Sequence, residues 1–475
     1  TNTVDCSLPS DLHTRRASYI SMSPQNQKLR RYQIVTFVLT FFVYASLHCC
    51  RETWATVKTN FKAHMGQSST FEGVEDTMFL IAYAIGLFLM GNLEDRINVR
   101  FFLLAGQFAT AVIVFLLGLT TWFHWTNPTI FIILWLLNGL VQSTAWPGLV
   151  CIMTHWYPLS IRGTIMGVWS ANAAVGNIIG EQLNNLVRDV IGLDWRYCLM
   201  FAAGFTALMG ILMLFFLKLS PAEVGIDLII GDESEGEALR PEEGKPVTFR
   251  QAWMIPGVAY YALAYATLKF ANYGMFLWIP TFMKKNYGTS SDEADDFTSM
   301  YDFGQIVGGM VAGYLGDRLG RRCPVIFVML IVAIGMFLTI FLNISDFNIL
   351  YFLIPASGIM IGGPANMISS AISADLGRSP QLHGGKALST VTGIIDGTGS
   401  LGAAIGQTLI GYIQGFGWKY YFLVLLIVCA CTLVSLSRML WNDVKHLKAE
   451  RQKRKKTRQY KSLSEDSDKE TLLSP

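Results

Sequence analysis

The sequence predicts an all-α polytopic membrane protein with about twelve transmembrane helices in two six-helix bundles. Of its 475 residues, 52% are hydrophobic and 15% are charged, whereas an average soluble domain carries about 25% charged residues. Long apolar segments recur along the chain, and one polar stretch divides them into two sets of six. This composition excludes a soluble globule and a disordered or fibrous chain, and a net charge of +3 does not point to nucleic acid.

A helix needs about 20 apolar residues to cross a hydrocarbon layer about 30 Å thick. The first bundle is expected over 32–217, with helices at 32–50, 77–92, 101–122, 129–155, 163–185 and 196–217. The second is expected over 253–441, with helices at 255–282, 297–315, 323–343, 348–371, 387–413 and 418–441. Three polar segments remain: a tail at 1–31, an acidic linker at 218–252 and a polybasic tail at 442–475 that we expect to be disordered.

Basic residues occur before the first span, after the second and eighth spans, and in the carboxyl-terminal tail, whereas the loop at 123–127 has no Lys or Arg. The positive-inside rule therefore places both termini in the cytoplasm. The polar amino-terminal segment does not resemble a signal peptide. Most cysteines, including Cys431, lie in apolar runs without metal-ligand spacing, so we interpret them as core thiols and expect no metal site.

The pattern G-x-L-x-D-R-x-x-x-R occurs twice, directly after the second helix of each half. The two copies supply Gly91, Asp95 and Arg96, then Gly313, Asp317 and Arg318. The glycine permits close helix approach, the aspartate can sit against a helix amino terminus, and the arginine stays at the water interface. Recurrence at matching places favours an internal repeat over an ordinary basic loop.

Charged residues within a membrane span cost about 2.5–3.5 kcal/mol on insertion scales, so each needs a reason. Tyr44, His48 and Arg51 share one face of the first helix. On the seventh helix, the same spacing places Tyr265, Lys269 and either Asn272 or Tyr273 on one face. Facing each other across a central cavity, these two helices would bind an anion, because Arg and Lys both suit phosphate or carboxylate. The alternative for Arg51 is snorkelling at the helix end.

Three acidic residues also lie within predicted spans, and one of them, Glu181, is expected near the luminal end and needs no function. Asp302 is expected to pair with Lys269 or with a partner in its own half, and Asp396 lies in a run of small residues. Each is a proton-coupling group, a structural counter-ion or a capping residue, and the pattern favours a structural role.

The doubled loop resembles the signature of the major facilitator superfamily. The stretch 44–51, Y-x-x-x-H-x-x-R, together with 142–147, 362–366 and 395–400, is similar to eukaryotic sugar-phosphate exchangers of the organophosphate:phosphate antiporter family. The resemblance implies exchange of a phosphate ester such as glucose 6-phosphate for inorganic phosphate, by halves that rock around a mid-membrane site. It also implies that Arg51 binds the phosphoryl group, with Lys269 as a matching lysine, and that no cofactor is needed.

The chain departs from this family at two places. Glu52 stands where a lysine often follows the arginine, and Asn172 and Ala173 stand where a histidine is common. The candidate hydrogen-bond donors beside the two cations are Tyr44, His48, Asn172 and Tyr273. These departures leave open a different phosphorylated substrate or weak transport, and with the long tail they suggest a transport-poor scaffold or sensor as one alternative. The other alternative is a proton-coupled organic-anion carrier in which His48, Asp302 or Asp396 titrates. Nothing in the sequence suggests an enzyme, since no nucleophile–base pair is apparent.

The carboxyl-terminal tail carries further signals. Asp468, Leu472 and Leu473 resemble an acidic dileucine motif, which would recruit a sorting adaptor and route the protein to endosomes or lysosomes. The family resemblance implies the endoplasmic reticulum instead. The basic stretch before this motif can bind anionic lipid or fix topology. Asn343 begins a glycosylation sequon on the predicted luminal side, close to the membrane.

Overall fold

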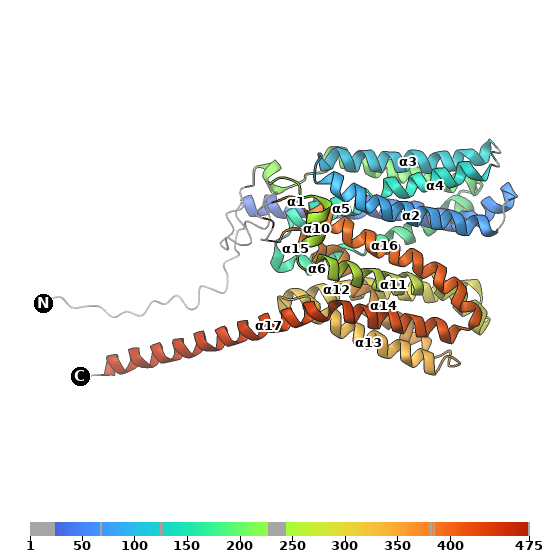
Figure 1. Ribbon diagram of the computed structural model, residues 1–475. Helices are drawn as coiled ribbons and strands as arrows, with labels where there is room; N and C mark the ends of the chain where they lie inside the picture. Colours follow the sequence, from blue (N-terminus) through green and yellow to red (C-terminus); the bar gives the residue numbers. More distant parts are fainter. Residues whose placement is uncertain are drawn as a thin grey trace.

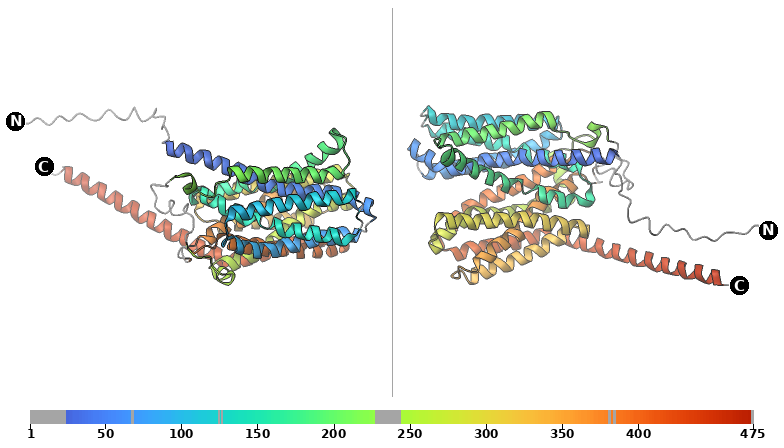
Figure 2. Two further views of the ribbon diagram at one scale, coloured as in Figure 1. Left: turned by 90° about the horizontal axis from the view of Figure 1, so that it is seen from above. Right: turned by 180° about the vertical axis from the view of Figure 1, so that it is seen from behind.

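A computed structural model describes residues 24–66, 69–123, 125, 127–226, 244–379, 382 and 385–473. Within this part the chain is a bundle of long helices, and the one β-type contact is an isolated bridge between Pro246 and Lys386. Figure 1 shows the two halves stacked side by side, with the helices running in one common direction. α1 begins and α17 ends on the same side of the bundle (Figures 1 and 2), and we call this the terminal side.

Six helical segments cross the first half, and two of them are interrupted. Their bounds are α1 (Pro24–Met65), α2 (Ser69–Glu94), α3 (Val99–Trp122), α4 (Pro128–Gln142) with α5 (Ala145–Trp156), α6 (Leu159–Trp169) with α7 (Asn172–Asn185) and η2 (Leu186–Val190), and α8 (Arg196–Phe216). Each span predicted for this half lies on one of these segments.

The second half repeats this arrangement after the connection between α8 and α11. The connection contains η3 (Pro221–Val224) and α10 (Phe249–Met254). The crossing segments are α11 (Val258–Tyr287), α12 (Ser291–Leu319), α13 (Cys323–Leu342), α14 (Leu350–Met367) with η4 (Ile368–Ile372) and α15 (Ser373–Gly377), α16 (Leu388–Ile413) with η6 (Gln414–Phe416), and α17 (Trp418–Leu473).

Eight helical segments of the described chain are long and apolar enough to cross a membrane by length and composition alone. The other crossing segments are α6 with α7, α11, α12 and α16, and their lower hydropathy has a structural reason. α6 and α12 form one contact between the halves, and α16 packs against α2 to form the other. Segments that face a second bundle or a polar cavity need small and polar residues, because lipid does not surround them.

Glycines allow the halves to approach closely at both contacts. A Cβ on Gly313 of α12 would lie 2.2 Å from the carbonyl oxygen of Gly163 on α6. A Cβ on Gly393 of α16 would lie 2.3 Å from the carbonyl oxygen of Leu87 on α2. Since real Cβ atoms do not come so near to backbone, each contact requires a residue without a side chain.

Two helix boundaries and the burial of one cysteine differ from the sequence-based expectation. α1 begins at Pro24 rather than near 32, and α17 continues as helix to Leu473, so the expectation of a disordered tail is wrong. Cys431 is exposed rather than a core thiol, whereas Cys49, Cys50, Cys151, Cys198 and Cys429 are buried. The acidic part of the predicted linker, 227–243, lies outside the described residues.

Candidate functional site

A cavity of about 310 Å³ lies between the two halves. This volume is within the range of small-molecule sites. Most of the residues predicted to bind or couple substrate line it: Tyr44, His48, Arg51, Lys269, Asn272, Tyr273, Asp302 and Asp396. The two polar helix faces expected from the spacing in α1 and α11 therefore meet in one chamber.

Arg51 is held by a neutral partner. Its Nε donates a hydrogen bond of 2.7 Å to Oε1 of Gln142 on α4. Its guanidinium carbon lies 5.1 Å from the ring centre of Phe79 and 4.7 Å from that of Tyr83. Nη2 is buried and has no hydrogen-bond partner among the described residues. The guanidinium is thus fixed in place by contacts that leave its charge uncompensated, and it keeps donors for an anion.

The rest of the polar face of α1 is packed by aromatic and amide groups. The hydroxyl groups of Tyr44 and Tyr83 lie 3.4 Å apart, and the Tyr44 ring centre is 4.8 Å from that of Trp146. Nδ1 of His48 lies 3.2 Å from Oδ1 of Asn177 on α7. These contacts orient the phenol and the imidazole toward the ligand space beside Arg51.

Lys269 forms an ion pair within its own half. Its Nζ lies 2.8 Å from Oδ1 of Asp396 and donates a further hydrogen bond of 2.9 Å to Oγ of Ser400. Lys269 is 6% exposed and Asp396 is 4% exposed. Asp396 therefore neutralises one of the two cations of the empty cavity in this conformation.

The remaining polar residues of the second half have local partners. The hydroxyl of Tyr301 donates a hydrogen bond of 2.8 Å to Oδ1 of Asn272. Nε2 of Gln305 donates one of 2.7 Å to Oδ1 of Asp302. Asp302 thus takes a partner in its own half, one of the two arrangements expected, while Asp396 rather than Asp302 pairs with the lysine.

Asn172 does not line the cavity. It is fully buried, and neither its amide oxygen nor its amide nitrogen has a partner. Asn177 of α7 lines the cavity instead. The sequence did not identify Asn177, nor Tyr83, which also lines the cavity, nor Gln142, which bonds to Arg51. The only feature of the sequence that could have pointed to these three residues is a polar side chain within an apolar span. Many residues with a purely structural role have the same feature.

On the terminal side the two halves are joined at their repeated loops. Asp95 accepts hydrogen bonds from the backbone N–H groups of Ser389 and Thr390, at 3.1 and 2.9 Å, where α16 begins. Asp317 accepts the corresponding bonds from Gly163 and Thr164, at 3.0 and 2.6 Å, near the start of α6. Each aspartate reaches a helix amino terminus of the other half, which confirms the placement expected from the motif.

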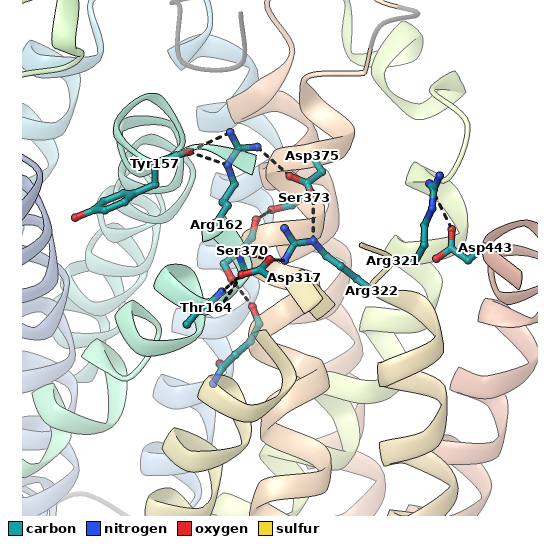
Figure 3. Close-up of polar contacts among 12 residues, drawn as sticks. Tyr157, Arg162, Thr164, Asp317, Arg321, Arg322, Ser370, Ser373, Asp375 and Asp443 are labelled. Atoms are coloured by element: carbon teal, nitrogen blue, oxygen red, sulfur yellow. Dashed lines mark hydrogen bonds and ion pairs between the residues drawn. The ribbon is translucent and has the colours of Figure 1, made fainter. Parts of the chain in front are cut away.

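The second of these junctions carries an additional ion-pair network (Figure 3). Asp375 lies 2.9 Å from Arg162 of the first half and 2.9 Å from Arg322 of the second. Arg322 also lies 3.6 Å from Asp317. Arg96 and Arg318 of the motif copies remain exposed at the water interface, as expected.

The cavity is bounded toward the terminal side by a further contact between the halves. Nε1 of Trp146 donates a hydrogen bond of 3.1 Å to the carbonyl oxygen of Ser369 in the other half. Away from the terminal side, Ala55 and Lys58 of α1 and Leu277 of α11 line the cavity. The structure is therefore a conformation in which the chamber is closed toward the side of the termini.

Comparisons with known proteins agree with this architecture. The Major Facilitator Superfamily model matches residues 35–380 and 261–467. Sugar phosphate exchanger 3 of Bos taurus is 38% identical over 90% of this chain and 96% of its own length, and that of Homo sapiens is 36% identical over 89% and 95%. A putative glycerol-3-phosphate transporter 2 of Arabidopsis thaliana is 32% identical over 88% of each chain.

Two solved structures share the fold at low sequence identity. The proton:xylose symporter XylE aligns with a TM-score of 0.66 at 14% identity, over 87% of this chain and 96% of its own. The E. coli fucose:proton symporter FucP aligns with a TM-score of 0.62 at 13% identity, over 85% and 98%. The two stacked bundles, the central chamber and these alignments have one explanation: the chain belongs to the major facilitator superfamily of membrane transporters, in the organophosphate:phosphate antiporter family that includes the eukaryotic sugar-phosphate exchangers.

Proposed function

We propose that this protein exchanges a phosphorylated sugar, such as glucose 6-phosphate, for inorganic phosphate by alternating access. The observation that carries the proposal is Arg51, a fixed guanidinium with a buried, unpartnered Nη2 on the wall of a cavity between the halves. A phosphoryl group supplies several acceptor oxygens and negative charge, and the guanidinium has neither an acceptor for Nη2 nor a counter-charge when the cavity is empty. The names of the relatives, sugar phosphate exchanger and glycerol-3-phosphate transporter, support this substrate class.

Lys269 is proposed as the second contact from the opposite half. An ammonium has three N–H donors, and the pair with Asp396 and the bond to Ser400 use two of them. The third is left for a phosphoryl oxygen. Tyr44, His48 and Tyr273 are proposed as hydrogen-bonding groups for the remaining substrate atoms, since all three line the cavity.

Exchange follows from the uncompensated charge on Arg51. When the halves close around an empty cavity, water is excluded from a guanidinium that has no counter-ion, and this desolvation is unfavourable by several kcal/mol, on the order of the penalty for a buried ion. A bound phosphoryl group supplies the counter-charge and removes most of that penalty. Inorganic phosphate and a phosphate ester present the same group to Arg51, so either can accompany the return of the carrier, whereas the empty carrier resists it.

The experiment is phosphate counterflow in proteoliposomes loaded with inorganic phosphate. Arg51→Ala is expected to abolish uptake, and Arg51→Lys to retain only part of it because a lysine keeps the charge but loses the planar fork. Arg438→Ala is the matched control, since Arg438 is exposed and contacts Tyr260 on the bundle surface. Normal uptake by Arg51→Ala, at wild-type amounts of reconstituted protein, would refute the proposal.

A proton-coupled organic-anion carrier is the second candidate, because Asp302 and His48 line the same cavity as the cations. Counterflow driven by internal phosphate at equal pH on both sides separates the two functions, since only an exchanger needs the internal anion. Measurable substrate-stimulated exchange also excludes a transport-poor scaffold.

We further propose an intracellular membrane with both termini in the cytoplasm. Exposed arginines lie at the ends of α2 and α12, in both repeated loops, in keeping with positive-inside bias. The endoplasmic reticulum is the expected compartment from the family, and endosomes or lysosomes are the alternative if the motif at Asp468, Leu472 and Leu473 recruits an adaptor. The side chains of that motif lie outside the described residues.

A further inference from the structure

Glu94, the last residue of α2, is a buried carboxyl group outside the cavity. It is 1% exposed, and neither carboxyl oxygen has a hydrogen-bond partner among the described residues. The carboxyl lies so close to α5 that a Cβ on Gly148 would be 1.8 Å from its Oε1. Protein thus encloses a group that ordinarily reaches water or a cation when it is charged.

The carboxyl lies where α2 of the first half meets the start of α16 in the second. Gly91, one turn before Glu94, is so near to α16 that a Cβ on it would lie 2.5 Å from the carbonyl oxygen of Ser389. The Ser389 hydroxyl lies beside the Glu94 carboxyl, and it too is buried without a hydrogen-bond partner among the described residues. The backbone N–H groups of Ser389 and Thr390 bond to Asp95. The positive end of α16 is therefore already occupied by another carboxylate.

No cation compensates Glu94 within the described part of the chain. The titratable group next to it, Asp95, has the same sign of charge and would repel a second carboxylate. The two arginines of the same motif have other partners, since Arg96 bonds to an asparagine of α2 and Arg100 pairs with a glutamate of η3 at 2.6 Å. α5 and α16 face the carboxyl with a glycine and a serine, which are neutral. A negative charge in these surroundings would be strongly unfavourable.

The equivalent junction of the other repeat is built from ion pairs instead (Figure 3). There Asp317 lies beside Arg322, and Asp375 joins this arginine to Arg162 of the first half. Each of these carboxylates has a cation, so it can be enclosed while it is charged. The two contacts that close the terminal side therefore differ: one contains compensated charges, and the other contains a carboxyl group without a counter-charge.

We infer that Glu94 is a proton-binding site that makes opening of the terminal side depend on the pH of the solution there. With the halves closed, the carboxyl keeps its proton and is neutral. When the halves separate, water reaches the group, and it ionises as an exposed glutamate does at neutral pH. Opening thus transfers a proton to water on the terminal side, and closing takes one up from the same side. No net proton crosses the membrane by this route, and the inference holds whichever anion is carried.

The direction of the pH effect follows from the proton balance. The closed state binds one proton more than the open state, so acid on the terminal side favours closure and a rise in pH favours opening. Above the ordinary range of an exposed glutamate, about 4.3, each pH unit raises the ratio of open to closed protein by up to about tenfold. Glu94→Gln has a side chain that is neutral at every pH, so this variant should stay closed throughout.

The experiment measures how fast a thiol introduced by Ser370→Cys reacts with a charged maleimide in the purified full chain. Ser370 of η4 is fully buried and does not line the cavity, and η4 packs against α6 of the first half, so the reagent reaches this position when the terminal side opens. Each rate is divided by that of free glutathione at the same pH, which removes the titration of the thiol. The corrected rate is expected to rise at least about tenfold from about pH 5.5 to about pH 7.5.

Matched variants assign this rise to Glu94. Glu94→Gln is expected to react slowly at both pH values, whereas Asp189→Asn, which neutralises an exposed carboxylate of η2, should keep the full rise. If Glu94→Gln fails to fold, Glu94→Met provides a neutral, apolar side chain with the same expected result. A corrected rate that is independent of pH in otherwise wild-type protein would overturn the inference, and so would an undiminished rise in the neutral variant.

Discussion

The ion pair between Lys269 and Asp396 can be tested by removing its members singly and together. The two atoms lie 2.8 Å apart, which corresponds to a gross attraction of about 6 kcal/mol at an effective dielectric constant of 20. Both side chains are less than a tenth exposed. Removal of one partner leaves the other charge buried, a change that costs about 3–5 kcal/mol in such sites. Lys269→Met and Asp396→Leu should therefore each lower the stability of the purified protein by this amount.

The double variant Lys269→Met with Asp396→Leu should be close to wild type in stability, because apolar residues of similar volume often replace a buried pair without loss. Stability is measured as the apparent Tm in detergent at one fixed scan rate, since proteins of this size commonly unfold irreversibly. Additive losses in the double variant, or singles that unfold like wild type, would refute an ion pair of this strength.

The same double variant measures what Lys269 contributes to transport. Loss of one hydrogen bond from a charged donor predicts a fall of roughly 10- to 100-fold in kcat/KM for phosphate exchange. Arg51 alone would then retain measurable activity. Wild-type activity in the double variant would show that the lysine is structural, and complete loss would show that it is the main anchor. Either result would refute the assignment of a secondary contact to Lys269.

Two further predictions concern the terminal side and the cavity wall. Asp317→Asn should open the terminal side more than Asp95→Asn, because Asp317 also lies beside Arg322 in the ion-pair network, whereas Asp95 bonds only to the start of α16 among its described contacts. Labelling of a single cavity cysteine from the terminal side measures this opening, and equal labelling rates in the two variants would contradict the prediction. Asn172→Ala should keep wild-type exchange without lowering the apparent Tm, because its buried amide has no partner among the described residues. Asn177→Ala should weaken exchange, because it removes the hydrogen-bond partner of His48 in the cavity. Similar losses of activity in both variants would contradict the placing of Asn177 rather than Asn172 at the site.

Much of the fold could be predicted from the sequence because lipid imposes a simple rule on composition. Every predicted span lies on a helical segment, since a membrane requires long apolar stretches with all backbone groups paired. The repeated loops could also be interpreted in detail. A glycine needed for close approach and an aspartate needed at a helix amino terminus are requirements of particular residue types, and Gly313 and Asp317 meet them against α6.

The polar contacts of the cavity could be predicted only in part, because they depend on how helices far apart in the sequence are rotated about their axes. Lys269 and Asp396 are 127 residues apart, and a change of one helix position turns a side chain by about 100°. Both residues were recognised as unusual in the sequence, but the sequence did not show that they pair. Arg51 and Gln142, 91 residues apart, illustrate the same limit.

Asn172 shows a second limit, which concerns interrupted helices. α6 ends at Trp169 and α7 begins at Asn172, so the segment expected as one span is two helices with a turn between them. Asn172 became a candidate through its place in the family resemblance, and a match in sequence position does not show which side of a helix faces the cavity. Asn172 is buried inside its own bundle, whereas Asn177, further along α7, lines the cavity.

The two halves contribute charge to the chamber in different ways, and this difference bears on how transport is coupled. The second half neutralises its cation internally through Asp396, so it can pack or separate at little electrostatic cost. The first half presents Arg51 without a counter-ion. Closure around an empty chamber is therefore opposed mainly by the desolvation of Arg51. A ligand lowers this barrier to the extent that it supplies hydrogen-bond acceptors and negative charge to the Arg51 guanidinium. Selectivity among phosphorylated ligands must then come from lining groups that Arg51 does not contact.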